Sequence, residues 1–111
     1  MLAYAEAVLA ARRAAQGREA LATFGKVRVE PNGVNAIPSR VTAWLDSRGS
    51  SVAGVRGVVE DLSGLGAMVT EESWTDETTF DTGLRDHLAA LLTGPDGRPV
   101  PSLSTGAGHD A

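Results

Sequence analysis

Two side chains suited to ligand recognition, Asn35 and Arg48, lie thirteen positions apart in the stretch VNAIPSRVTAWLDSR. A planar guanidinium grips a carboxylate through two parallel hydrogen bonds. An asparagine amide offers both a donor and an acceptor. Each residue also has an ordinary structural interpretation, because strand-end arginines are usually solvated and loop asparagines often hold a turn. The two residues therefore indicate a candidate carboxylate or amide site without selecting a ligand.

Other polar residues carry weaker signals. Asp46 is expected on the same side of its strand as Trp44 and Arg48, so pairing with a nearby arginine is favoured over acid–base chemistry. His87 is expected on the surface of a helix. The C-terminal GAGHDA lacks the lysine and the helix start of a phosphate-binding loop. Apart from any family pattern, no residue of this chain points to a metal site.

The elements that must position these residues begin with a hairpin. Alternating apolar and polar residues predict strands over residues 22–30 and 40–48, paired antiparallel. The PNG turn signal opens the connection, and Pro38 stiffens its end. Because residues 31–39 exceed a tight hairpin loop, they indicate a functional loop.

Helical patterns flank the hairpin. Residues 1–16 are rich in alanine and end before Gly17, and a third helix is expected over residues 81–93 with Asp81 or Thr82 as its N-cap. GSS at residues 49–51 caps a second helix. Its predicted core stripe comprises Val52, Val55, Val59, Leu62 and Leu65, and that of the third helix comprises Leu84, Leu88, Leu91 and Leu92.

A further strand is predicted at residues 67–74, AMVTEESW, with a polar stretch running on to residue 79. The order helix, strand, strand, helix, strand, helix predicts an α+β fold. The first five of these elements match a ferredoxin-like βαββαβ unit without its first strand. Both ends of the chain look like cut edges, so we expect a piece of something larger.

Composition narrows the functional classes. The chain has 111 residues and a net charge of −4, so one small domain is expected and binding to nucleic acid or anionic membranes is not. It has no cysteine and no apolar run of about 20 residues, which excludes disulfides, thiolate metal sites and a predicted membrane span. Its N-terminus is unlike a signal peptide, so a cytoplasmic location is the default expectation.

Three stretches, MLAYAEAVLAARRAA, VEPNGVNAIPSRVTAWLDSR and GAGHDA, together resemble metal-dependent amidohydrolases of the carbamoylase type in the M20 superfamily. That group includes N-carbamoyl-L-amino-acid hydrolases, β-ureidopropionase and allantoate amidohydrolase. The resemblance implies a catalytic α/β domain with two divalent metal ions, zinc or manganese, and an inserted ferredoxin-like lid that forms a homodimer. Residues 1–76 would be a partial lid domain, and residues 77–111 the start of the return into the catalytic domain.

The resemblance also implies roles for single residues. Asn35 matches a substrate-contacting asparagine, and Arg48 matches the arginine that binds the substrate carboxylate. Gly108 matches a glycine whose backbone N–H meets substrate, and His109 matches a histidine of the active-site wall. Thr105 replaces the usual serine before the glycines. The family's metal ligands, its general-base glutamate and the HAG stretch of its first lid strand have no counterpart here.

The implied activity is hydrolysis of a C–N bond in a small ureido acid, with this segment binding the substrate carboxylate and mediating dimerisation. By itself the chain is expected to be inactive. One alternative is a stand-alone, non-catalytic dimerisation or binding module, or a gene fragment. Another is the lid of a related M20 dipeptidase or aminoacylase, although the run NAIPSRV and the later DSR favour the carbamoylase type.

Overall fold

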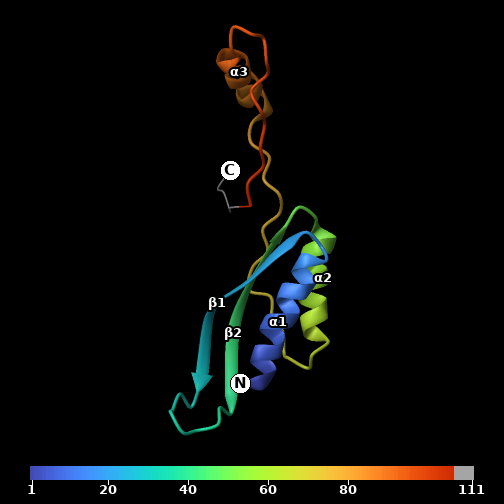
Figure 1. The fold of residues 1–111 in the computed structure, drawn as a ribbon. Helices are drawn as coiled ribbons and strands as arrows, with labels where there is room; N and C mark the ends of the chain where they lie inside the picture. Colours follow the sequence, from blue (N-terminus) through green and yellow to red (C-terminus); the bar gives the residue numbers. More distant parts are fainter. Residues whose placement is uncertain (107–111) are drawn as a thin grey trace. The chain divides into compact units, whose positions relative to one another are not determined.

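The computed structural model describes residues 1–106, which belong to two compact units, Met1–Thr70 and the residues from Glu71 onward. The first unit contains helix α1 (Leu2–Gln16), strands β1 (Ala20–Glu30) and β2 (Arg40–Gly49), and helix α2 (Val52–Ser63). The second contains helix α3 (Thr82–Leu92). The predicted α+β class is confirmed (Figure 1). The longest helix in the described range has 15 residues, too few to cross a membrane.

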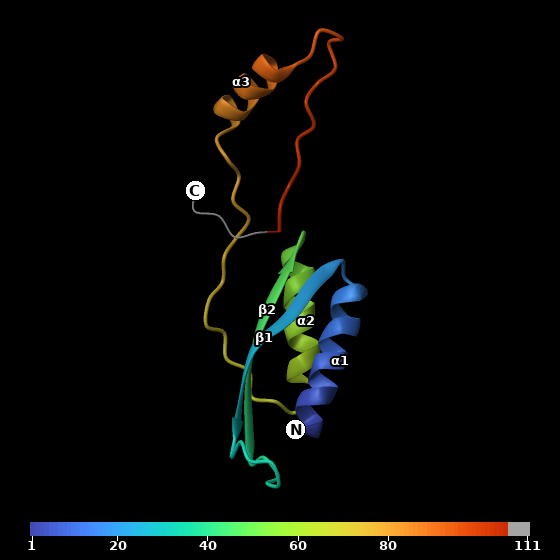
Figure 2. The same cartoon turned by 60° about the vertical axis from the view of Figure 1, so that its left-hand side comes forward.

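In the first unit, α1 and α2 lie side by side on one face of the antiparallel sheet (Figure 2). The centre of this packing is Val58 of α2 against Ala14 and Ala15 of α1. Ala20, Ala22 and Leu45 of the sheet pack onto the same cluster. Because the α1 residues at the contact are alanines, the two helix backbones can approach closely, and a small core closes between helices and sheet.

The hairpin pairs with a single irregularity. Phe24 lies opposite Leu45 and Lys26 lies opposite Trp44, so Gly25 is an extra residue that forms a β-bulge. After the bulge, Val27 and Val29 return to the face that carries Phe24, opposite Ala43 and Val41 of β2. The predicted alternation of both strands is therefore confirmed, although the bulge was not anticipated. Tyr4 of α1 meets Phe24 edge to face, with ring centroids 5.8 Å apart.

Helix α2 begins as predicted, because the Ser51 hydroxyl accepts a hydrogen bond from the Gly54 backbone N–H at 3.0 Å. Its predicted core stripe was partly wrong. The buried residues are Gly54, Val55, Val58 and Leu62, whereas Val52 and Leu65 are exposed and Val59 is half-buried. The buried face is set by contact with α1, and apolar spacing alone does not reveal which of two adjacent stripes makes that contact.

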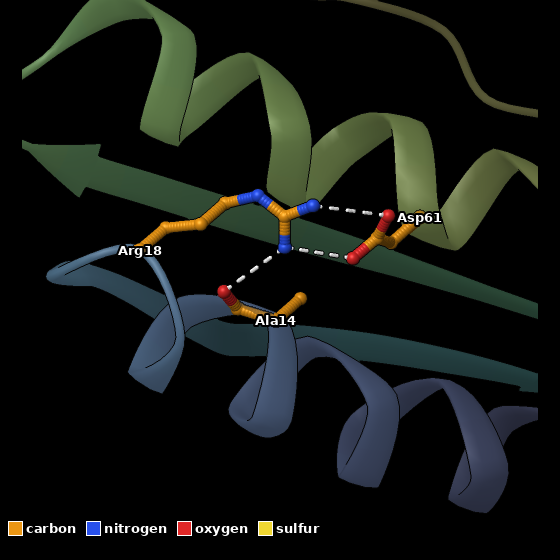
Figure 3. Close-up of polar contacts among 3 residues, drawn as sticks. All are labelled: Ala14, Arg18 and Asp61. Carbon is orange, nitrogen blue, oxygen red and sulfur yellow. Dashed lines mark hydrogen bonds and ion pairs between the residues drawn. The ribbon is translucent and has the colours of Figure 1, made fainter.

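Arg18, in the turn between α1 and β1, ties that turn to α2 (Figure 3). Its two terminal nitrogens donate to the Asp61 carboxylate at 2.8 and 3.3 Å, and Nη1 also donates to the Ala14 carbonyl at 3.2 Å. The arginine side chain runs directly over Gly57, where an added Cβ would collide with its Nε. Gly57, which weakens the helix on propensity grounds, therefore makes room for this ion pair.

The strand predicted at residues 67–74 does not form. Within the described range the sheet has only two strands, β1 and β2, so residues 67–74 have no neighbouring strand to take their backbone N–H and C=O groups. Met68 is 97% exposed, which fits an extended segment without a packed face. The ferredoxin-like prediction thus holds for the order helix, strand, strand, helix, and fails for the strand that follows.

Helix α3 starts where predicted, with the Asp81 carboxylate accepting a hydrogen bond from the Leu84 N–H at 2.6 Å. The prediction that its leucines form a core was wrong for this chain. Leu84, Leu88, Leu91 and Leu92 are between 47% and 67% exposed, and no residue of α3 is buried. Between residues 71 and 106 the structure contains no second helix or strand that could cover them.

Replacing Val58 with alanine should lower the free energy of unfolding of the first unit by about 2 kcal/mol, because the side chain is fully buried at the helix–helix contact. Val52→Ala is the matched control. It makes the same chemical change in the same helix at a position 59% exposed, and should change stability by less than about 0.5 kcal/mol. Urea unfolding followed by circular dichroism measures both. Equal unfolding midpoints would refute the packing assignment.

Gly57→Ala should not give the usual gain of about 1 kcal/mol in helix stability, because Arg18 must leave its position over Gly57. In an Arg18→Ala background the same change should stabilise by about 1 kcal/mol, since the obstruction is gone. A double-mutant cycle of unfolding free energies tests this coupling. Equal gains in the two backgrounds would show that Arg18 does not pack against Gly57.

Candidate functional site

The sheet has one face on the helices and one face turned away from them, which we call the outward face. Ala20, Ala22 and Leu45 pack on the helices, so strand alternation and the register assign the intervening side chains to the other side. The outward face comprises Leu21, Thr23, Lys26, Arg28 and Glu30 of β1, and Arg40, Thr42, Trp44, Asp46 and Arg48 of β2. Four of these ten residues are basic and two are acidic, so this face is cationic on a chain with a net charge of −4. Such a face attracts anions.

Arg48 lies near the end of β2, opposite Leu21. Its Nε donates to Asp46 Oδ2 at 2.8 Å, and the arginine side chain is 48% exposed. The prediction that Asp46 pairs with a nearby arginine is confirmed. A guanidinium carries five N–H donors, so an arginine that gives its Nε–H to one carboxylate has the chemistry to meet a second carboxylate through its Nη groups.

Lys26 and Trp44 form a second feature of the outward face. The Lys26 ammonium lies 4.3 Å from the centroid of the Trp44 ring, which is the geometry of a cation–π contact. This pair was not predicted from the sequence, because its facing positions depend on the bulge at Gly25. A contact between an aromatic residue on one strand and a lysine on the other can be predicted only when the register of the two strands is known.

Asn35 lies in the connection between the strands, at the opposite end of β2 from Arg48. The base of this connection is closed by Ser39, whose N–H and hydroxyl both donate to the Glu30 carbonyl, at 2.8 and 3.0 Å. Asn35 is exposed, and its side chain makes no hydrogen bond within residues 1–106. Residues 40 to 48 span roughly 26 Å of strand. One chain therefore does not bring Asn35 and Arg48 to the same small ligand.

The remaining predicted site residues, Gly108 and His109, lie outside the described residues. His87 is exposed on α3, as predicted. In the described range no three histidine, cysteine, aspartate or glutamate side chains gather in a way that could hold a metal ion. The recognisable part of the candidate site is therefore the outward face around Arg48 together with the connection that carries Asn35.

Comparison with known proteins gives a partial match. The chain is 31% identical over 100 residues to the allantoate amidohydrolase of Escherichia coli (strain K12), and this similarity covers 80% of the chain. It covers only 24% of the relative, so the chain spans about a quarter of that protein's length. No family model matches the chain, and no solved structure matches it. The similarity is thus to one segment of an amidohydrolase.

Proposed function

We propose that the chain is the lid segment of a metal-dependent amidohydrolase of the M20 superfamily. The parent enzyme hydrolyses the C–N bond of an N-carbamoyl amino acid or a related ureido acid such as allantoate. Two observations support this: the similarity to allantoate amidohydrolase over 80% of the chain, and the place of Arg48 on a cationic sheet face. The second carries the proposal, because an arginine on a cationic face is suited to hold the carboxylate of an anionic substrate.

In this function the segment binds and orients substrate. Arg48 holds the substrate carboxylate, and Asn35 reads an amide or ureido group. Since the two lie at opposite ends of β2, we propose that the parent is a homodimer in which the connection of one copy approaches the strand end of another. Gly108 and His109 complete the site by analogy with the family motif. Holding the reacting group in place is the contribution that such residues make to catalysis.

In this proposal, the metal ions are bound by the parent enzyme outside the described residues. The described residues do not fit a metal centre, since they contain no suitable cluster of ligands. The two divalent ions of the family therefore belong, in this proposal, to other segments of the parent. The described residues contribute recognition of substrate, and the activation of water is not among their roles.

A second candidate is a non-catalytic dimerisation module. The two-stranded sheet favours it, because within residues 1–106 β1 pairs only with β2 and has a second edge that another copy could extend. The two candidates differ in what Arg48 does. In a module without substrate, changing this arginine has no effect on a reaction.

Arg48→Ala should raise KM for allantoate by about 10- to 100-fold, the value of a charge-assisted hydrogen bond. The test uses a chimera of the Escherichia coli allantoate amidohydrolase in which this chain replaces the matching quarter. A carboxamide analogue of allantoate should be affected much less, because it lacks the charge. Arg40→Ala, on the same strand and face, is the matched control and should leave KM nearly unchanged. Equal losses on acid and amide, or equal effects of the two variants, would reject the clamp role.

The 111-residue chain alone should bind no stoichiometric zinc and hydrolyse neither N-carbamoyl amino acids nor allantoate. The reason is that, in this proposal, the metal ligands belong to other parts of the parent. Metal analysis of purified chain after dialysis, together with an ammonia-release assay, measures both properties. One zinc per chain accompanied by turnover would contradict the assignment of the chain as a substrate-binding segment.

A further inference from the structure

Asp46 and Arg48 form a pair that fixes one edge of the guanidinium. The two residues are two positions apart on β2 and therefore share the outward face. The hydrogen bond from Arg48 Nε to Asp46 Oδ2 is 2.8 Å long, within the short range of charge-assisted bonds. The Asp46 side chain is 57% exposed, so its carboxylate lies at the surface where a ligand would approach.

The geometry of this bond bears on how the arginine meets a ligand. A guanidinium has an Nε–H on its stem and two Nη groups at its end, held in one plane. A carboxylate that takes the Nε–H fixes the rotation of that plane about the last side-chain bonds. The fork of two Nη groups then keeps a constant direction, instead of sampling the many rotamers of a free arginine.

We propose that Asp46 is a positioning residue for Arg48, and that it orients the guanidinium so that its Nη fork receives the substrate carboxylate. This inference rests on the proposed function of Arg48. It predicts an effect opposite in sign to simple electrostatics. Removing the Asp46 charge makes the face more cationic, which by charge alone strengthens anion binding. Removing the orientation weakens it.

The chain contains a control for the loss of a negative charge elsewhere on the outward face. Glu30 and Arg28 are also two positions apart on the outward face, on β1, with Arg28 Nε 3.6 Å from Glu30 Oε2. Glu30→Gln removes one negative charge from the same face without changing the partner of Arg48 Nε. Because Glu30 lies opposite Arg40, roughly 26 Å of strand from Arg48, this change leaves the field at Arg48 almost unaltered and controls for the loss of a distant charge. Asp46→Asn removes the charge beside Arg48 and keeps an oxygen acceptor, so its comparison with Asp46→Ala separates charge from orientation.

The first experiment observes the pair directly. In the ¹⁵N-labelled chain, the Arg48 Nε–H resonance should be shifted and slow to exchange with water, and Arg48→Ala assigns it. Asp46→Ala should remove both signatures, Asp46→Asn should retain part of them through its carbonyl oxygen, and Glu30→Gln should retain them fully. An Arg48 resonance that is unchanged in Asp46→Ala would overturn the inference without any reference to ligand.

The second experiment measures the consequence in the chimera with the Escherichia coli enzyme. Asp46→Ala should raise KM for allantoate about three- to tenfold, the factor expected for losing the order of one long side chain, with a much smaller change for the carboxamide analogue. Asp46→Asn should recover part of this loss, and Glu30→Gln should leave KM unchanged, because Glu30 is distant from Arg48. If Asp46→Ala lowers KM, charge alone governs binding and the inference is wrong.

The two proposals fail differently. If Arg48→Ala leaves KM unchanged, the clamp itself is rejected, and the positioning role with it. If Arg48→Ala raises KM while Asp46→Ala does not, the clamp stands and only the positioning role falls. Should the chimera not fold, titration of the labelled chain with N-carbamoylglycine and its amide gives dissociation constants in place of KM, and the same comparisons apply.

Discussion

The contact of Val58 with Ala14 and Ala15 joins the two helices of the first unit into a single layer. A two-stranded sheet is only marginally stable in water without a surface to pack on. The hairpin therefore depends on this layer, which receives Leu45 and the alanines of β1. Small residues recur wherever elements approach closely, and Gly57 of α2 provides space for the arginine that ties the α1–β1 turn to the neighbouring helix.

Because one face of the sheet packs on the helices, the side chains of the other face are mostly exposed to solvent. Strand alternation sends every second residue away from the core, and in this sequence those residues are mostly charged or polar. Arg48 and Asp46 are consequently neighbours on a rigid strand and not on a loop, and sites built on strands are more exact than sites built on loops. The connection that carries Asn35 is fastened at its base by the two hydrogen bonds that Ser39 donates to the Glu30 carbonyl.

Short-range patterns predicted short-range features well. The two strands, the Ser51 and Asp81 caps and the pairing of Asp46 all follow from residues close together in the chain. The predictions that were wrong concern residues whose environment depends on partners distant in the sequence. An apolar stripe such as that of α3 shows which side could be buried, but not whether anything covers it. Within residues 1–106, the stretch 67–74 has no neighbouring strand. Similarly, the Lys26–Trp44 contact depends on cross-strand register, and Gly108 and His109 lie beyond the described residues.

The bulge at Gly25 gives β1 a spare residue. A chain shortened by that one position would pair as a regular strand, with Phe24 and Lys26 adjacent and each side chain still on its present face. Loss of Thr23 instead would turn Phe24 away from Tyr4. In β1, a deletion at Gly25 therefore keeps every side chain on its present face. A deletion at a neighbouring position would move side chains between the core face and the outward face. Over evolutionary time, a deletion at Gly25 would leave the cationic face intact.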